Sequence, residues 1–365
     1  MTITAEENYK GLDEWLERKK KVLLVCDSSI TFLKRLNRKL NEVNVDFQIF
    51  SDFQPNPLYE SVVKGVEVYR AEGCDSIMAV GGGSAIDVAK CIKLYSNLPG
   101  NGEDGAWLDA ESIPNDIPFL AMPTTAGTGS EATQFAVIYF NGTKQSISSE
   151  SIIPSTVLMD SSALKTLPLY QKKATMCDAL CHAIESFWSI NSTEESKKYS
   201  RQAIDLVMHN MDGYLANTDE GNEGMLFAAN IAGKAINITQ TTAGHAMCYK
   251  VTSLFGCAHG HAAILCDRVL FPWMIENTDK CIDPRGQEYL KSILNEIGIA
   301  LGCDNGKTGA KKLIEIFEKM ELDVPTATKE QYNELKISVN PMRLRNHPIA
   351  LNLEAINTLY HQILR

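Results

Sequence analysis

The stretch "DSIMAVGGGSAIDVAK", residues 75–90, decides the fold class. An apolar run typical of a buried strand ends in three glycines, and a pattern with helical spacing follows at once. Glycines at such a turn let backbone amides approach an anion without a side chain in the way. The start of the helix adds unpaired N–H groups and a partial positive charge, so the turn predicts a phosphate site. The alternative is an ordinary strand–helix turn without a ligand.

The same alternation continues on both sides of this turn. Apolar strand-like runs alternate with helical patterns, which predicts an α/β domain with a mainly parallel sheet and helices on both faces. The expected strands cover residues 21–27, 45–51, 75–83, 118–125, 133–140 and 154–160, and the expected helices cover 28–43, 57–73 and 84–96.

Beyond residue 165 the strand signals fade and helical patterns dominate. We therefore expect two domains, an α/β domain over 1–165 and an all-helical domain over 166–365. Ser192 and Glu195 predict a capping box at the start of the second helix. The expected helices cover 174–190, 193–214, 224–239, 243–254, 261–276 and 286–301.

Composition excludes several classes of protein. The formal net charge of −10 argues against nucleic acid and anionic membranes as partners. No apolar run approaches the roughly 18 residues that a membrane span needs, and the polar first 21 residues do not resemble a signal peptide. Ten cysteines without a CxxC pair indicate reduced thiols. These features together predict a cytoplasmic protein.

A second loop with ligand-binding potential is "MPTTAGTGSEAT", residues 122–133. Thr124, Thr125, Thr128 and Ser130 can hydrogen-bond a ribose or a nicotinamide amide, although an ordinary Ser/Thr-rich turn is equally compatible. Two such loops at the ends of neighbouring strands favour a dinucleotide.

Two acids lie close to these loops. Asp27 ends the first strand, where a carboxylate accepts hydrogen bonds from an adenosine ribose and repels a 2′-phosphate. This position favours NAD(H) over NADP(H). Asp87 lies one turn into the helix after the glycines and can simply complement the helix dipole.

The segment "CDALCHAIES", residues 177–186, suggests a metal site. Asp178 and His182 are four residues apart, which puts both on one helix face with β-carbons about 6 Å apart. Such a pair is often a surface hydrogen bond, but here the neighbours are apolar, and a buried Asp and His need a partner. Cys177 and Cys181 point elsewhere and are expected to be core thiols.

Two further donors lie in "GHAMCYKVTSLFGCAHGH", residues 244–261. On one unbroken helix His245 and His259 would be about 21 Å apart. If the helix ends near Gly256, the next residues can bring His259 back. Asp178, His182, His245 and His259 then form a mixed N/O set suited to Fe²⁺ or Zn²⁺. His261 either supports the site or is merely polar. His209, His347 and His361 are expected in polar surroundings without a special role.

Together, "GGGSAIDVAK", "MPTTAGTGSEAT", "DALCHAIES" and the His245/His259 pair resemble the iron-containing alcohol dehydrogenase family over about residues 20–275. The resemblance implies a dehydroquinate synthase-like architecture, with an N-terminal dinucleotide-binding domain and a helical C-terminal domain that holds a metal and the substrate. It also implies roles by position. Gly82, Gly83 and Ser84 would hold the diphosphate, Thr124 and Thr125 would lie along the cofactor, Asn56 and Lys144 would contact it, and Asp178, His182, His245 and His259 would be metal ligands.

The chain departs from the family pattern at Tyr249. Many members carry there a second histidine, thought to relay a proton. Tyr249 keeps a hydroxyl, and Lys250 together with a metal would lower its pKa. The alternative relays are a water molecule or the ribose hydroxyls.

Residues 244–261 and "SVNPMRLRNHP", residues 338–348, look most like the branch that reduces phosphonoacetaldehyde to 2-hydroxyethylphosphonate. A phosphonate needs cations, and the candidates are Lys250, His261, Arg343 and Arg345. The two arginines are equally compatible with a solvated loop.

The resemblance implies reversible hydride transfer between NAD(P)H and a small aldehyde, by an enzyme that can form a homodimer. Three alternatives stay open: a general short-chain alcohol dehydrogenase of the same family, a dehydroquinate synthase-type lyase, and a non-catalytic binding protein. The lyase type uses NAD only transiently and includes a glutamate among its metal ligands, so the Asp178/His182 pair argues against it.

Overall fold

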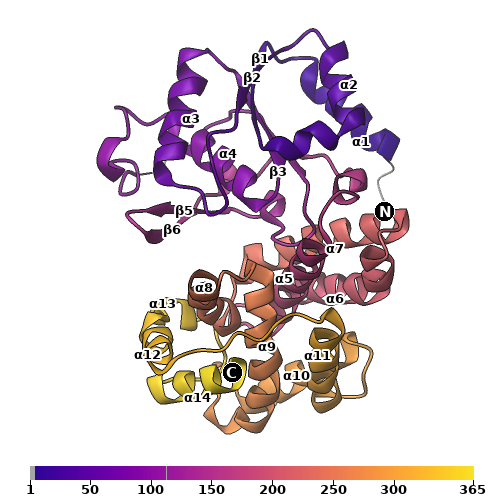
Figure 1. Ribbon diagram of the computed structural model, residues 1–365, viewed down its shortest axis with the longest axis vertical. Helices are drawn as coiled ribbons and strands as arrows, with labels where there is room; N and C mark the ends of the chain where they lie inside the picture. The colour runs from indigo at the N-terminus through magenta and orange to yellow at the C-terminus, as the bar shows by residue number, and fades with distance from the viewer. Residues whose placement is uncertain (1–4, 112) are drawn as a thin grey trace. The chain divides into compact units, whose positions relative to one another are not determined.

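The computed structural model describes residues 5–111 and 113–365 and divides into two compact units (Figure 1). Unit 1 runs to Thr125 and continues over Gly129–Leu167. Unit 2 holds Pro168–Arg365 together with the short segment Ala126–Thr128. The second expected dinucleotide loop is therefore shared between the units, which the pattern of the sequence does not indicate.

Unit 1 is built on a five-stranded parallel sheet with the order β2-β1-β3-β4-β7. Its strands are β1 (Lys21–Cys26), β2 (Asp46–Phe50), β3 (Ser76–Gly81), β4 (Phe119–Pro123) and β7 (Thr156–Val157). From β1 the chain adds β2 on one side and then β3, β4 and β7 on the other. The carboxyl ends of β1 and β3 therefore flank the topological switch point, where ligands of open α/β sheets bind.

Alternating side chains of the strands feed two cores. On β1, Leu23 and Val25 pack in a cluster with α3 (Tyr59–Ala71) and α4 (Gly83–Tyr95). Val22 and Leu24 pack on the opposite face with α1 (Ala5–Leu16) and α2 (Lys34–Glu42). Strands buried on both faces explain the continuous apolar runs in the sequence. The predicted α/β domain with a parallel sheet is confirmed.

Two local expectations need correction. The strand expected at 133–140 is β5 (Phe135–Phe140), and it pairs antiparallel with β6 (Thr143–Ser148) outside the main sheet. Asn141 and Gly142 both have positive φ, which suits a two-residue hairpin turn. The helix expected from residue 28 begins as a 3₁₀ helix, Ser28–Phe32, before α2. The other 3₁₀ helices are Glu103–Gly105, Ser130–Ala132, Glu150–Ile152, Ser161–Leu164 and Thr278–Lys280.

The secondary-structure elements of unit 2 in its described part are all helices, as predicted, and an isolated antiparallel bridge joins Cys281 and Ile349. Its helices are α5 (Leu169–Trp188), α6 (Glu194–Leu215), α7 (Asp219–Thr239), α8 (Ala243–Phe255), α9 (His259–Glu276), α10 (Gln287–Ala300), α11 (Gly306–Met320), α12 (Lys329–Ser338), α13 (Pro341–Leu344) and α14 (Leu353–Ile363). The expected Ser192–Glu195 capping box is wrong by one residue. Thr193 caps α6, accepting from Ser196 N–H at 3.1 Å, and Ser196 Oγ accepts from Thr193 N–H at 2.9 Å. None of the helices in the described ranges has the length and apolarity that crossing a membrane requires.

Candidate metal centre and cofactor loops

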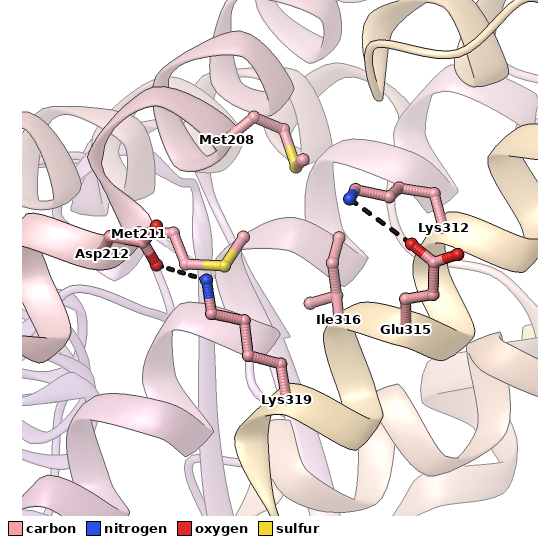
Figure 2. A pocket seen from close by; sticks show the side chains of 7 residues that line it. All are labelled: Met208, Met211, Asp212, Lys312, Glu315, Ile316 and Lys319. Carbon is pink, nitrogen blue, oxygen red and sulfur yellow. Dashed lines mark hydrogen bonds and ion pairs between the residues drawn. The ribbon is translucent and has the colours of Figure 1, made fainter.

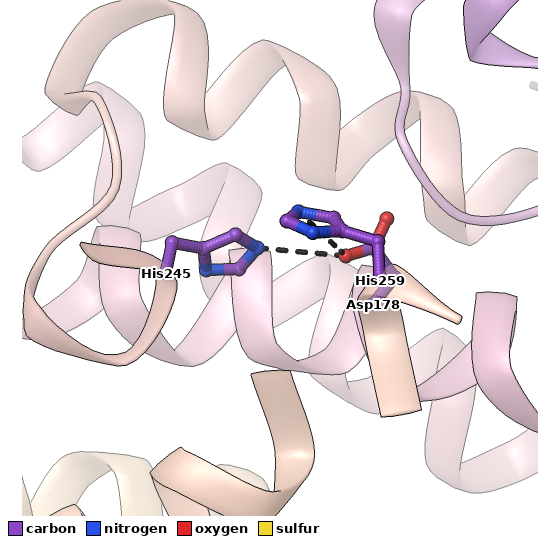
Figure 3. Close-up of side chains that lie close together, drawn as sticks. All are labelled: Asp178, His245 and His259. Atoms are coloured by element: carbon purple, nitrogen blue, oxygen red, sulfur yellow. Dashed lines mark ion pairs between the residues drawn. The ribbon is translucent and has the colours of Figure 1, made fainter. Parts of the chain in front are cut away.

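Three donor side chains meet inside unit 2. The ligand atoms of Asp178, His245 and His259 lie within 4.8 Å of one another, and Figure 3 shows both rings beside the carboxylate. Asp178 Oδ1 lies 3.5 Å from His245 Nε2 and 3.9 Å from His259 Nε2. The structure thus brings together residues from α5, α8 and α9.

The turn between α8 and α9 makes this meeting geometrically feasible. Gly256 ends α8 with φ of 68°, a left-handed conformation that glycine adopts without strain. Only two residues then separate Gly256 from His259, the first residue of α9. The helix end expected near Gly256 is present, and it returns His259 to the level of His245.

His182 lies beside this group. Its Nε2 is 4.0 Å from Asp178 Oδ1, and its ring stacks on that of His245 with a centroid distance of 4.4 Å. Burial lowers the pKa of His182 to about 4, although the Asp178 carboxylate opposes the shift. His182 is therefore neutral at pH 7, the form in which an imidazole binds a metal.

Two atoms of the group are unsatisfied. Asp178 Oδ1 and His245 Nε2 are buried and have no hydrogen-bond partner among the described residues. Buried polar atoms are rarely left this way, because each lost partner costs about 1–3 kcal/mol. Burial raises the pKa of Asp178, but His182 and the other two imidazoles outweigh it and hold the pKa well below its usual range. An anionic carboxylate beside imidazole nitrogens fits a divalent cation.

Glu185 holds His245 in the orientation that such an ion needs. Its carboxylate accepts from His245 Nδ1 at 2.5 Å and from His245 N–H at 2.9 Å. It also accepts from the N–H and the hydroxyl of Thr242 at 2.5 and 2.6 Å. A proton fixed on Nδ1 leaves Nε2, which faces Asp178, as the nitrogen that can bind an ion once the ion replaces its proton. Sequence reasoning missed Glu185, although a glutamate in the apolar run after His182 was an available signal.

Cys248 is the second residue that sequence reasoning missed. Its thiol donates to the carbonyl oxygen of His245 at 3.3 Å, and its sulfur lies 3.6 Å from His259 Nδ1. The sulfur therefore contacts the side of the His259 ring that faces away from Asp178. Cys177 and Cys181 are fully buried, as expected of core thiols.

Tyr249 lies against the centre, but its phenol differs from the expectation. Its ring stacks on His259 with a centroid distance of 5.5 Å, and its hydroxyl accepts from Arg343 Nη1 at 3.3 Å. Burial raises the pKa of Tyr249 well above 10, and Arg343 only partly opposes this. The expected lowering by Lys250 is wrong, because the Lys250 ammonium pairs with Glu334.

His261 braces the start of α9. Its Nδ1 lies 3.1 Å from Tyr170 Oη and its Nε2 lies 2.8 Å from the carbonyl oxygen of Asp323. The Tyr170 hydroxyl in turn accepts from Ala258 N–H at 2.9 Å. Both ring nitrogens are engaged, which favours the merely polar alternative over a catalytic role.

His347 contradicts the expectation of polar surroundings. It is fully buried, and its ring meets the indole of Trp188 edge to face at a centroid distance of 6.4 Å. Burial lowers the pKa of His347 to about 4.

The glycine turn of unit 1 leaves the backbone N–H groups at the start of α4 accessible to a ligand. Gly82 caps α4 without a side-chain hydrogen bond, so no cap side chain takes the first N–H groups of α4, which starts with Gly83 and Ser84. A β-carbon on Gly81 would lie 2.6 Å from Ala85 Cβ and 3.8 Å from Asp27 Oδ2. Asp27 and the glycines therefore share the carboxyl edge of β1 and β3.

The second loop follows β4, next to the glycine turn. Thr124 N–H donates to the carbonyl oxygen of Gly81 at 3.0 Å, and a β-carbon on Gly82 would lie 3.3 Å from Thr125 Cγ2. Thr128 belongs to unit 2. Asn56 is exposed and has a φ of 58°.

Asp87 and Ser130 are joined by a hydrogen bond. Asp87 Oδ1 accepts from Ser130 Oγ at 2.7 Å, and its Oδ2 accepts from Val137 N–H at 2.9 Å. Asp87 thus connects α4 to the second loop and to β5. Lys144, on β6, lies near enough for its charge to oppose the rise in the pKa of Asp87 that burial causes.

Lys90, which sequence reasoning missed, organises the second loop from inside. Its buried ammonium donates to backbone and hydroxyl oxygens of Ser130 and Thr133 and to the carbonyl oxygen of Phe135, at 2.5–3.1 Å. Five acceptors around one ammonium fix the path of residues 130–135.

A hollow of about 340 Å³ elsewhere on unit 2 adds no candidate site (Figure 2). Met208, Met211 and Ile316 form its apolar part, and an ion pair between Lys319 and Asp212 lies at its side. Its charged side chains pair with one another, and no histidine or cysteine lines it.

Comparison with known families decides the classification. The family model "Iron-containing alcohol dehydrogenase" matches residues 2–161, and "Fe-containing alcohol dehydrogenase family, C-terminal" matches residues 172–363. The chain belongs to the iron-containing alcohol dehydrogenase family. It is therefore an oxidoreductase of the alcohol dehydrogenase type, and the resemblance drawn from the four motifs is confirmed at family level.

Relatives with assigned activities match most of this alcohol dehydrogenase. The NAD-dependent methanol dehydrogenase of Bacillus methanolicus is 32% identical over 260 residues, which cover 69% of this chain and 67% of the relative. The NADPH-dependent butanol dehydrogenase of Clostridium saccharobutylicum is 28% identical over 325 residues, covering 86% and 81%.

Solved structures share the whole fold. The sulfoacetaldehyde reductase from Bifidobacterium kashiwanohense, in complex with NAD⁺, superposes with a TM-score of 0.85 at 25% identity, covering 97% of this chain and 93% of that one. A 1,3-propanediol oxidoreductase superposes with a TM-score of 0.86 at 24% identity, covering 98% and 95%. The two-part architecture expected from the sequence is thus confirmed.

Proposed function

We propose that this protein reduces a small aldehyde to its primary alcohol with NAD(H), and that Asp178, His182, His245 and His259 hold a divalent ion, Fe²⁺ or Zn²⁺, for this reaction. The observation that carries the proposal is the pair of buried atoms Asp178 Oδ1 and His245 Nε2, which lie 3.5 Å apart and have no hydrogen-bond partner among the described residues. A divalent ion there would supply the Lewis acidity that polarises a carbonyl group.

The chain's own residues prepare this centre. Glu185 keeps the proton of His245 on Nδ1, and Cys248 contacts Nδ1 of His259. The side chain of His259 is 37% exposed, whereas those of Asp178 and His245 are almost completely buried. Substrate would therefore approach from the side of His259. The proton that completes the alcohol comes from Tyr249, from water or from the ribose hydroxyls.

Unit 1 is proposed to bind the dinucleotide, with the diphosphate at Gly82, Gly83 and Ser84. Support comes from the uncapped start of α4 at the switch point of the sheet. Asp27 beside Gly81 would repel a 2′-phosphate, so we propose NAD(H) over NADP(H). Thr124 and Thr125 are proposed to line the same cofactor.

For the substrate we propose an aldehyde with an anionic tail, with phosphonoacetaldehyde as the candidate. The guanidinium of Arg343 lies 5.0 Å from the ring centroid of Tyr249, and the Tyr249 ring also stacks on His259. Lys250 pairs with Glu334 and His261 is hydrogen-bonded at both nitrogens, so Arg343 is the favoured cation. Sulfoacetaldehyde, named for one structural relative, also carries an anionic group next to its aldehyde.

A panel of aldehydes tests the substrate. Metal-loaded protein should oxidise NADH with phosphonoacetaldehyde at a kcat/KM at least tenfold above that for acetaldehyde, and Arg343→Leu should remove most of this preference. Arg345→Leu, an exposed neighbour, is the matched control and should retain it. A preference that Arg343→Leu leaves unchanged would remove Arg343 as the cation, and a parent protein without the preference would favour a general short-chain alcohol dehydrogenase.

The same assay distinguishes the proposed reductase from a lyase. A dehydroquinate synthase-type lyase shows no net change in absorbance at 340 nm, whereas this proposal requires stoichiometric oxidation of NADH. Assembly as a homodimer is a separate prediction, which light scattering on the purified protein tests.

A further inference from the structure

A second carboxyl group lies behind Glu185 at the proposed metal centre. Asp267, on α9, is completely buried, and neither of its side-chain oxygens has a hydrogen-bond partner among the described residues. The neighbouring Arg268 points away, because its guanidinium stacks over Phe317 and donates to the carbonyl oxygen of Ile363. Asp267 thus forms no ion pair with any of the described residues, although a buried carboxylate needs one.

Gly244 is the reason this carboxyl group fits. A β-carbon at Gly244 would lie 1.9 Å from Asp267 Oδ1 and 2.6 Å from Glu185 Oε1. Any side chain there would collide with both acids. Because one hypothetical atom would touch both oxygens, the two carboxyl groups lie close together, next to the residue that precedes His245.

Two neighbouring buried carboxyl groups cannot both be ionised at neutral pH, so one of them keeps a proton. Glu185 accepts from four donors of Thr242 and His245, which stabilise its charge. Among the described residues, the donor near Asp267 is the thiol of Cys181, which is a weak one. The geometry therefore assigns the proton to Asp267.

We propose that Asp267 is a positioning residue of the metal centre, an uncharged carboxyl group that donates a hydrogen bond to Glu185 and thereby fixes the carboxylate that orients His245. The proposal rests on the proposed metal site. Asp267 also lies within electrostatic reach of His245 and of the Cys181 thiol. Because the proton of Asp267 points at Glu185, the negative charge stays on the Glu185 carboxylate, which accepts the hydrogen bond from His245 Nδ1–H.

The test is the affinity for Zn²⁺, measured by equilibrium dialysis against a competing chelator on the full chain. Asp267→Leu keeps the size of the side chain but removes the donor, and it should weaken Zn²⁺ binding about 10- to 100-fold, the usual effect of losing a partner behind a ligand. Asp267→Asn keeps an N–H donor and should bind within about threefold of the parent.

Asp283→Asn is the matched control. Asp283 is also a buried acid of unit 2, but it pairs with Arg285 at 2.6 Å. Its loss should lower the melting temperature without changing Zn²⁺ affinity, which separates positioning from stability.

Three results would overturn the proposal: unchanged Zn²⁺ affinity in Asp267→Leu, an Asp267→Asn variant as weak as Asp267→Leu, or equal weakening in Asp283→Asn. If Asp267→Leu does not fold, infrared difference spectra of the parent and Asp267→Asn decide, because only a protonated acid gives a carboxylic C=O band. The absence of that band in the parent would refute the proposal. A parent protein that binds no Zn²⁺ would refute the proposed metal site itself.

Discussion

The turn around Gly82 in unit 1 and the centre around Asp178 in unit 2 are built from different parts of the chain. The turn offers backbone N–H groups, and its side chains matter mainly by being small. The centre offers side-chain atoms, and each is held by further buried side chains such as Glu185 and Cys248. Single substitutions should therefore damage the centre much more than the turn.

The largest effect is expected from Asp178→Asn. The change keeps the shape but removes the only negative charge of the proposed ligand set, so Zn²⁺ affinity should fall on the order of 10³-fold. NADH binding by unit 1, followed by fluorescence, should stay within twofold. An unchanged Zn²⁺ affinity in equilibrium dialysis would remove Asp178 from the ligand set.

Lys90→Met tests the buried ammonium group that holds residues 130–135 in unit 1. Removing the ammonium takes one donor away from five oxygens of residues 130–135, so the free energy of unfolding should fall by about 3 kcal/mol in urea titrations. Zn²⁺ affinity should not change. Lys64→Met, which breaks an exposed pair with Asp52, is the control and should leave stability almost unaltered. Equal stability losses in both variants would contradict the assigned role of Lys90.

The stability of the metal-free protein should also depend on pH. This effect should be smaller than those of the two substitutions above, but it reports on the charge of His245. Burial lowers the pKa of His245, but Glu185 and Asp178 outweigh it and raise the pKa to about 10. Because this value exceeds the unfolded one of about 6.5, the stabilisation is complete below pH 6.5 and is lost as the pH rises through 10.

Metal-free protein should thus lose on the order of 2 kcal/mol of stability between pH 7 and pH 10, measured by urea unfolding. A bound ion replaces the proton, so Zn²⁺-loaded protein should not show this loss. The Glu185→Gln variant should show a smaller slope. Identical slopes for the metal-free and metal-loaded forms would contradict the paired state of His245.

The smallest effect is expected from Tyr249→Phe. The phenol accepts from Arg343, and burial raises its pKa well above 10, so it is a poor proton relay at neutral pH. We expect kcat to fall less than tenfold, with an unchanged pH–rate profile. A loss of 10² to 10⁴-fold, together with the disappearance of an alkaline limb, would instead make Tyr249 the relay.

The same contrast explains what the sequence could predict. Strand–helix alternation identified the sheet of unit 1, and the spacing of Asp178, His182 and the breaker at Gly256 predicted the meeting of α5, α8 and α9. Such signals are local or periodic. The sequence did not predict the roles of Glu185, Asp267 and Lys90. These roles depend on contacts with residues tens of positions away, and no local pattern indicates such contacts.

Several local predictions from the sequence were wrong for similar reasons. The predicted cap of α6 was wrong by one residue. Thr193 and Ser196 form the hydrogen bonds that were expected of Ser192 and Glu195. His347 looked polar from its neighbours in sequence, yet the fold buries it against Trp188. Lys250 has a partner, Glu334, on a helix that the periodicity did not reveal.

The most direct test of the account follows absorbance at 340 nm in one sample of protein before and after the metal is removed. Protein loaded with Fe²⁺ or Zn²⁺ should oxidise NADH when an aldehyde is added, lose this activity when a chelator strips the metal, and regain it when one equivalent is returned. Turnover that persists in the stripped protein would contradict a metal-dependent alcohol dehydrogenase centred on Asp178, His245 and His259.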